Sequence, residues 1–155
     1  MVQLSPLLQD HAEQISKLGV ADSQLPYVGT TEEILATVSL DVQPHVICLD
    51  GEVVGMFLVD TCYSADYEFC RHPALGFRAF FVDHQFQGQG VAKAALKLLP
   101  EYLAERYRDF HQVYLTVNCK NPAAYNCYLK AGFEDTGDHY HGGAAGPQHI
   151  MYRQF

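Results

Sequence analysis

The chain has 155 residues, of which 48% are apolar and 18% charged, a composition typical of a globular protein with a full core. Its formal net charge of −8 argues against nucleic-acid binding, which needs a basic face. An acidic chain attracts small cations, although acidic residues also serve solubility alone. The apolar runs are short and interrupted, so we expect no membrane contact.

The N-terminus and the cysteines indicate where the protein works. Residues 1–6 contain neither a basic region nor an apolar run, so we expect no secretory signal. The five cysteines form no Cys-x-x-Cys pair, and reduced thiols in a cytoplasmic protein are the simplest interpretation. Because no linker or repeat interrupts the chain, we expect a single domain over residues 1–155.

The N-terminal half is predicted to be helical and then to form a hairpin. Apolar residues three and four apart predict a first helix within Leu4–Leu18, and Thr31 is a candidate cap for a second, short helix. The segment between them reads as a loop that presents Tyr27 to a substrate. Asp50-Gly51, a pair favoured in tight turns, predicts a hairpin over residues 45–59.

The C-terminal half alternates strands and helices. After a polar and aromatic connection, the patterns predict these elements in order: a strand at Leu75–Val82, a helix after Gly90 that Pro100 should kink or end early, a strand at Val113–Val117, a helix at Pro122–Lys130 and a strand at Ile150–Phe155. The glycine-rich residues 142–147 read as a hairpin loop. This order predicts an α/β fold with both parallel and antiparallel pairing.

The turn before the long helix carries Gln85-x-x-Gly88-x-Gly90. Glycines let the backbone approach a ligand closely, and the start of the following helix offers free N–H groups to a phosphate. A Walker loop is excluded because no Lys-Ser/Thr follows Gly90. A dinucleotide fingerprint is excluded because Lys93 stands where its third glycine belongs. The turn therefore predicts a diphosphate site.

A second motif follows downstream, where Asn121 opens a helix and Tyr128 precedes Gly132-Phe133 by four residues. The two motifs, in this order, resemble the GNAT N-acetyltransferase superfamily over Leu75–Phe133. The resemblance implies a GNAT-type mixed central sheet of about six to seven strands, flanked by about four helices. It also implies acetyl-CoA as co-substrate.

The resemblance gives each motif residue a role. The strand residues Phe81 and Val82 would offer backbone N–H to the thioester carbonyl, as acyl transfer requires. Asn121 would bond the pantetheine arm, and Tyr128, a phenol that is protonated at neutral pH, would protonate the leaving thiolate. The residues expected to hold the diphosphate are Gln87, Gly88, Gln89, Gly90, Val91 and Ala92.

The acceptor follows from charge and from a likeness within the superfamily. Gln24-Leu-Pro-Tyr27 and the strand end at Phe80 look most like bacterial diamine and polyamine acetyltransferases, although Arg78 stands where some of those relatives carry an acid. We therefore predict a small di- or polyamine as partner. The residues expected to hold it are Tyr27, Asp66 and Glu68. Aminoglycosides, amino acids and protein N-termini remain alternative acceptors, as does a non-catalytic acyl-CoA-binding module, and a homodimer is left open.

A substrate ammonium must lose its proton before it attacks. The candidate bases, among which the sequence does not choose, are Glu32, Glu33, Asp66, Glu68, Asp83 and His84.

Metal and thiol chemistry are predicted to be absent. His139 and His141 would share one side of a strand near His149, but no third ligand of known geometry is evident in the sequence. Cys119 and Cys127 have no positioned histidine partner, which favours buried thiols over nucleophiles.

Overall fold

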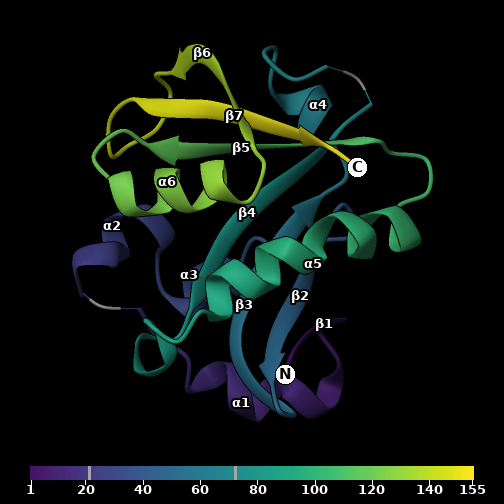
Figure 1. Cartoon of the computed structure of the whole chain (residues 1–155), viewed down its shortest axis with the longest axis vertical. Coiled ribbons are helices and arrows are strands. Elements are labelled where there is room, and N and C mark those ends of the chain that lie inside the picture. Colours follow the sequence, from purple (N-terminus) through teal and green to yellow (C-terminus); the bar gives the residue numbers. More distant parts are fainter. Residues whose placement is uncertain (21, 72) are drawn as a thin grey trace.

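The computed structural model describes residues 1–20, 22–71 and 73–155. Its strands form one seven-stranded sheet in the order β1-β2-β3-β4-β5-β7-β6 (Figure 1). The strands are β1 (Val2–Pro6), β2 (Val42–Leu49), β3 (Glu52–Asp60), β4 (Leu75–Val82), β5 (Gln112–Asn118), β6 (Glu134–Tyr140) and β7 (Gln148–Gln154). The sheet combines parallel and antiparallel pairs, which confirms the predicted α/β fold with a mixed central sheet of six to seven strands.

The central feature of the sheet is the junction of β4 and β5, the parallel pair among the described strands. These strands are in register only at Leu75 opposite Val113 and Gly76 opposite Tyr114. Beyond Gly76 they diverge, so that the sheet splits from its middle (Figure 1). Among the described residues, the facing edges of β4 and β5 beyond Gly76 thus lack ladder pairing with each other, which leaves room for a ligand between them.

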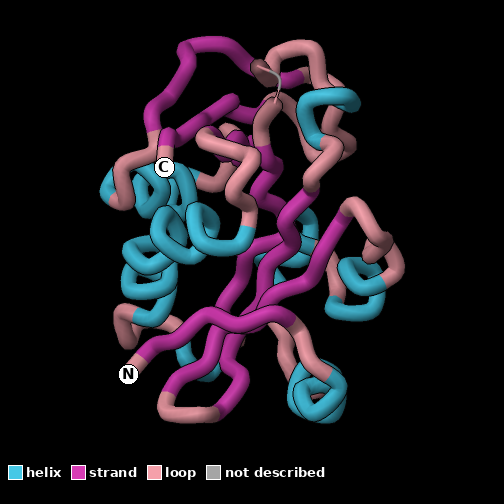
Figure 2. Tube along the Cα trace, turned by 90° about the vertical axis from the view of Figure 1, so that its right-hand side faces the viewer, coloured by secondary structure: helices cyan, strands magenta, loops and turns pink. Residues whose placement is uncertain are grey.

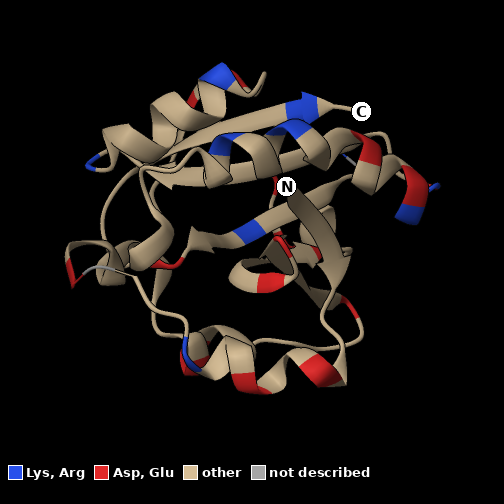
Figure 3. Ribbon diagram, turned by 60° about the horizontal axis from the view of Figure 1, so that its bottom comes forward, with Lys and Arg blue, Asp and Glu red and all other residues tan. Residues whose placement is uncertain are grey.

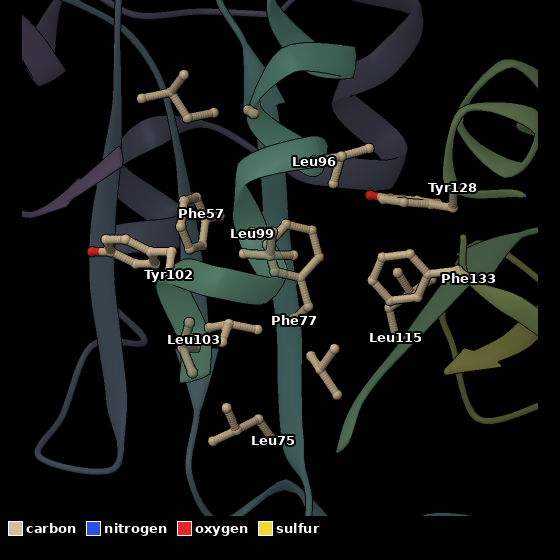
Figure 4. Close-up of a cluster of buried hydrophobic side chains, with 14 of the residues drawn as sticks. Phe57, Leu75, Phe77, Leu96, Leu99, Tyr102, Leu103, Leu115, Tyr128 and Phe133 are labelled. Carbon is tan, nitrogen blue, oxygen red and sulfur yellow. The ribbon is translucent and has the colours of Figure 1, made fainter. Parts of the chain in front are cut away.

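Helices cover both faces of the sheet. The long helix α5 (Val91–Arg106) and α6 (Pro122–Lys130) pack on one face, in the cluster that includes Phe57, Phe77 and Leu115 (Figure 4). On the other face, α1 (Ala12–Ser16) and α3 (Thr31–Leu35) bury Ile15 and Ile34. Figure 2 shows the sheet between these groups of helices.

The remaining helical segments are short. They are α2 (Leu25–Val28), α4 (Tyr63–Asp66) and the 3-10 turns Gln9–His11, Asp22–Gln24 and His84–Phe86. None of the described helices is long and apolar enough to cross a membrane.

The hairpin, the Leu75–Val82 strand and the Pro122–Lys130 helix were predicted correctly. Pro100 does not end α5 early, because the helix continues to Arg106. A proline inside a helix removes one backbone hydrogen bond, and burial of the neighbouring Leu99, Tyr102 and Leu103 offsets that loss.

The predicted Leu4–Leu18 helix is wrong at its start. Residues 2–6 form β1, which pairs antiparallel with β2, and the α-helix covers only Ala12–Ser16. The physical reason is Pro6, because a proline disfavours the helical conformation in the residue before it.

Three smaller corrections concern local signals. Thr30, not Thr31, caps α3: its hydroxyl accepts from the Glu33 N–H at 3.2 Å. The predicted loop before it contains α2. Strand β6 lacks an apolar alternation because it is a largely exposed edge strand, and its pattern therefore carried no strand signal.

Candidate active site

The split between β4 and β5 opens into a cavity of about 950 Å³. Its walls come from β4, the turn that follows it, the N-terminus of α5 and the inner side of α6. Residues of α2, α3 and α4 and the loop between β6 and β7 complete it. Of the predicted site residues, those that line the cavity are Tyr27, Phe81, Val82, Gln87, Gly88, Gly90, Val91, Ala92, Asn121 and Tyr128.

The end of β4 directs one peptide group into the split. The Asp83 N–H donates to the Val54 carbonyl of β3 at 2.7 Å, so the peptide groups of the preceding residue, Val82, face away from β3. The Val82 carbonyl accepts from Gln87 Nε2 at 3.1 Å, and its N–H points to the same side. A Cβ at Gly55 would collide with the Phe81 backbone oxygen, which therefore faces β3. The Val82 N–H is therefore directed into the cavity, where a ligand can accept from it. The Phe81 N–H faces β3, so the predicted backbone donor at Phe81 is not directed into the cavity.

A bulge shapes β4 just before this point. Met56 pairs with Phe81 and Leu58 pairs with Arg78, so that one residue of β3 faces two residues of β4. Ala79, within the bulge, has a φ of +53°, a conformation that residues with a side chain rarely adopt. The bulge turns the end of β4 away from the regular ladder and toward the cavity.

The glycine turn presents backbone donors to the cavity. Gly88 and Gly90 both have a φ of +79°, which glycine adopts readily. The first intrahelical bond of α5 runs from the Ala94 N–H to the Gly90 carbonyl, at 3.0 Å. The N–H groups of the residues before Ala94 thus have no partner within the helix and suit an anion. Lys93 adds a positive charge to this wall.

Gln89 lies apart from the other residues of the turn. Its side chain Nε2 donates to the Gln85 carbonyl at 3.4 Å, and the residue is exposed. Gln89 is not among the described residues that line the cavity. Its predicted contact with the diphosphate would therefore have to come from its backbone.

Helix α6 contributes Asn121 and Tyr128 from the opposite wall. Asn121 is buried at the helix start, where its Nδ2 donates to Gln24 Oε1 at 3.5 Å. Tyr128 is packed among Phe77, Phe80 and Phe133. Its hydroxyl points toward Leu96 of α5 (Figure 4). Burial raises the pKa of Tyr128, so that the phenol stays protonated and is a proton donor at neutral pH.

The acidic residues predicted to hold the acceptor lie outside this cavity. Asp66 ends α4 and Glu68 follows it, and both are exposed. Among the described residues of the cavity wall, the one carboxylate belongs to Glu33 of α3. Arg78 also lines the cavity, but its guanidinium lies 3.4 Å from the buried Asp60 carboxylate. This pair is neutral overall, so Glu33 carries the one unpaired carboxylate charge among the described residues of the cavity wall.

Two of the candidate bases have other surroundings. Asp83 is buried and accepts from the N–H groups of Gly19 and Gln85, at 3.0 Å and 2.9 Å. These bonds fix the turn after β4. His84 is exposed beside it and does not line the cavity. Among the candidates, Glu33 is the one on the cavity wall.

The sequence did not indicate Lys93, Arg78 and Asn118 as cavity residues, and it indicated Glu33 only as one of six candidate bases. Lys93 carried a usable signal, since a basic residue in the first helical turn after two glycines suits a phosphate. The capping box Thr30-x-x-Glu33 would have located α3. Arg78 had no such signal, because its pairing with Asp60 depends on strand register.

Comparison with protein families gives a match to the Acetyltransferase (GNAT) family over residues 13–133, most of the chain. The chain belongs to the GNAT family of acetyltransferases. Its activity is accordingly acetyl-CoA-dependent N-acetyl transfer, and the predicted superfamily is confirmed.

Curated relatives point in the same direction. The spermine/spermidine N(1)-acetyltransferase of Bacillus subtilis is 27% identical over 139 residues, which cover 88% of this chain and 90% of that protein. The uncharacterised N-acetyltransferase YbbJ of the same organism is 26% identical over 140 residues, or 88% of this chain and 87% of that protein.

Solved structures share the fold. The aminoglycoside acetyltransferase AAC(6')-Ib in complex with coenzyme A superposes with a TM-score of 0.78 at 19% identity, covering 99% of this chain and 95% of that one. The spermidine N-acetyltransferase from Vibrio cholerae, in complex with CoA and spermine, gives a TM-score of 0.71 at 18% identity, with 99% and 95% coverage.

Proposed function

We propose that this GNAT enzyme transfers the acetyl group of acetyl-CoA to a primary amine of a small di- or polyamine. The observation that carries the acceptor proposal is Glu33, the one carboxylate among the described residues of the cavity wall. A protonated second amine of the substrate would pair with it. The rings of Tyr27, Tyr67 and Tyr140 line the same cavity and suit the aliphatic chain and its cations. The match to a spermine/spermidine acetyltransferase over 88% of the chain supports the same acceptor.

In the proposed reaction, the cavity wall positions acetyl-CoA by its diphosphate and its thioester. The free N–H groups at the start of α5, together with Lys93, bind the negative diphosphate. The Val82 N–H, which faces away from β3, donates to the thioester carbonyl oxygen. Asn121, at the start of α6, hydrogen-bonds to the pantetheine arm. These contacts place the acetyl carbon beside the split in the sheet.

The transfer then needs one neutral amine and one acid. The amine nitrogen attacks the acetyl carbon, the carbon–sulfur bond breaks, and the proton that the new amide nitrogen loses passes to water, from which Tyr128 recovers the proton that it gives to the thiolate. Tyr128 protonates the departing thiolate, since its buried phenol is neutral at working pH. The ammonium must first release a proton, and because its ordinary pKa is about 10 the rate should rise with pH above neutrality.

The test compares carboxylates inside and outside the cavity. Glu33→Gln keeps a side chain that still fits the capping box of α3, so only the charge is lost. We expect kcat/KM for spermidine to fall about tenfold or more, as for loss of a charged hydrogen bond, with the KM for acetyl-CoA unchanged. Asp66→Asn and Glu68→Gln are the matched controls and should leave kcat/KM near the wild-type value.

The same assay should include putrescine, spermine, an aminoglycoside, free amino acids and a peptide N-terminus. Turnover of an aminoglycoside or an amino acid without turnover of any polyamine would reject the acceptor proposal. A large effect of Asp66→Asn or Glu68→Gln with none of Glu33→Gln would move the acceptor site to the α4 region.

A further inference from the structure

A cluster of soft ligands lies at the outer part of the sheet. Cys119 follows β5, His149 lies in β7 and His139 lies in β6. His149 is the cross-strand partner of both His139 and Val117. Cross-strand partners share one face, and so does a residue two positions along a strand. Cys119 stands two positions after Val117, and its N–H still pairs with the Pro147 carbonyl at 3.0 Å, so all three side chains project from one face.

The ligand atoms of these three residues converge. The Cys119 sulfur and one ring nitrogen from each of His139 and His149 all lie within 4.8 Å of one another. We propose that Cys119, His139 and His149 bind one divalent transition-metal ion of the zinc class. Thiolate and imidazole are the ligands that Zn²⁺ prefers, at about 2.3 Å and 2.0–2.1 Å, and small side-chain rotations bring the three atoms to these distances.

A carboxylate lies beside one of the histidines. Asp135 Oδ2 lies 3.7 Å from His149 Nδ1, and the Tyr125 hydroxyl donates to the same oxygen at 2.6 Å. The Tyr125 ring packs on His149 at 4.3 Å between centroids. A histidine whose Nδ1 faces a carboxylate presents its Nε2 to a metal, and such an outer partner fixes the ring. The Gly137 N–H, which donates to the other oxygen of Asp135 at 2.8 Å, completes this support.

The fold explains why the sequence indicated no metal. His139, His141 and His149 were recognisable, but the third ligand, Cys119, precedes His139 by a whole helix and reaches the cluster only through the pairing of β5 with β7. His141 lies nearby, with its ring centroid 6.3 Å from that of His139, and it or a water fills the fourth position.

The cluster adjoins the cavity wall along the chain. Each of its members is the sequence neighbour of a cavity residue: Asn118 precedes Cys119, Tyr140 follows His139 and Gln148 precedes His149. A bound ion would hold β5, β6 and β7 together at this wall. The metal thus fixes the part of the cavity wall formed by Asn118, Tyr140 and Gln148 without touching the reacting atoms.

The test is titration of reduced, tag-free protein with Co²⁺, followed by displacement with Zn²⁺. We expect one equivalent to bind with a thiolate-to-cobalt charge-transfer band and the visible spectrum of tetrahedral Co²⁺. Cys119→Ser should abolish the charge-transfer band, and His139→Asn should weaken binding at least tenfold. His139 is exposed, so this variant tests the site without disturbing the core.

The matched controls replace a thiol and an imidazole elsewhere. Cys62→Ser and His111→Asn should keep both the band and the affinity of the wild type, because both residues lie outside the cluster. Thermal unfolding of each metal-free variant shows that it is folded. Absence of one-equivalent binding, a charge-transfer band that survives Cys119→Ser, or equal loss in the controls would each overturn the metal site.

Discussion

Tyr128 combines burial with a position on the cavity wall. Apolar rings surround it, and burial raises the pKa of its phenol, so the hydroxyl is protonated at neutral pH and has a proton to donate to a thiolate that forms beside it. The same surroundings would suit a residue whose only role is packing. Removal of the hydroxyl distinguishes proton donation from packing, since the ring alone supplies the packing.

Tyr128→Phe keeps the ring and removes the proton donor. We expect kcat to fall about 10²–10⁴-fold, the range for a positioned general acid, while the KM for acetyl-CoA changes little. Steady-state kinetics with acetyl-CoA and spermidine measures both values. An unchanged kcat would show that the thiolate leaves without Tyr128.

His45 illustrates a buried polar residue with a structural role. The Tyr107 hydroxyl donates its proton to Gln43 Oε1. The same hydroxyl oxygen lies 2.8 Å from His45 Nε2 and is therefore the acceptor in that second hydrogen bond. His45 Nε2 therefore carries the hydrogen, and Nδ1 accepts from the Tyr102 hydroxyl. Burial, assisted by the nearby Arg106, lowers the pKa of His45 to about 4.

This pKa makes stability depend on pH. Because the unfolded histidine titrates near 6.5, the unfolded state binds more protons between about pH 6.5 and 4, and stability falls as pH drops through that window. From pH 7 to pH 5 the loss due to His45 should be about 2 kcal/mol. Urea unfolding at the two pH values measures it. His45→Gln should remove this part of the pH dependence, whereas replacement of the exposed His111 should not; equal pH dependence in both variants would contradict it.

At the scale of elements, the β4 bulge connects the fold to the cavity. Ala79 has a positive φ, which costs a residue with a Cβ about 1–2 kcal/mol. Ala79→Gly should relieve this strain, and the relief should offset the loss of stability that glycine usually causes. The matched control is Ala94→Gly within α5, which should cost about 1 kcal/mol. Thermal unfolding compares them, and an Ala79→Gly variant destabilised as much as Ala94→Gly would show that the bulge is unstrained.

The elements with strong local signals were predictable. The Asp50-Gly51 turn located the hairpin, and Pro122 at the first helical turn located α6. The glycine turn and the Asn121–Tyr128 helix located much of the cavity for the same reason. Strand β1 was not predicted, because the helical spacing of apolar residues after Pro6 was taken to begin already at Leu4.

The part of the cavity wall that contains Glu33 and Arg78 was less predictable, because it depends on contacts between distant segments. Glu33 enters the cavity through the packing of α3 against the sheet, and Arg78 is neutralised by Asp60 across the β3–β4 pair. The acids closer to the tyrosines in sequence, Asp66 and Glu68, lie outside the cavity wall. Asp66 and Glu68 were predicted from their place near tyrosines in the sequence, whereas Glu33 reaches the cavity wall only through the packing of α3 against the sheet.

For the molecule as a whole, the local charge at the start of α5 affects diphosphate binding more than the net charge of the chain does. The chain carries a formal charge of −8, yet the first half of α5 bears Lys93 and Lys97, whereas its second half bears Glu101, Glu105 and Arg106 (Figure 3). The cavity thus presents a cation and free N–H groups where the diphosphate would bind, and Glu33 where the amine would bind. Such a division suits an anionic and a cationic substrate that meet in one cavity.

The most direct test of this account is the affinity of acetyl-CoA, measured by calorimetry, for two aspartate variants. Gly90 and Gly51 both have positive φ and no atom within 4 Å of an added Cβ, but only Gly90 lines the cavity. Gly90→Asp sets a carboxylate against the diphosphate and should weaken binding by at least about tenfold, or 1.4 kcal/mol, whereas Gly51→Asp should bind as the wild type does. Wild-type affinity in Gly90→Asp would contradict the placement of acetyl-CoA between β4 and β5.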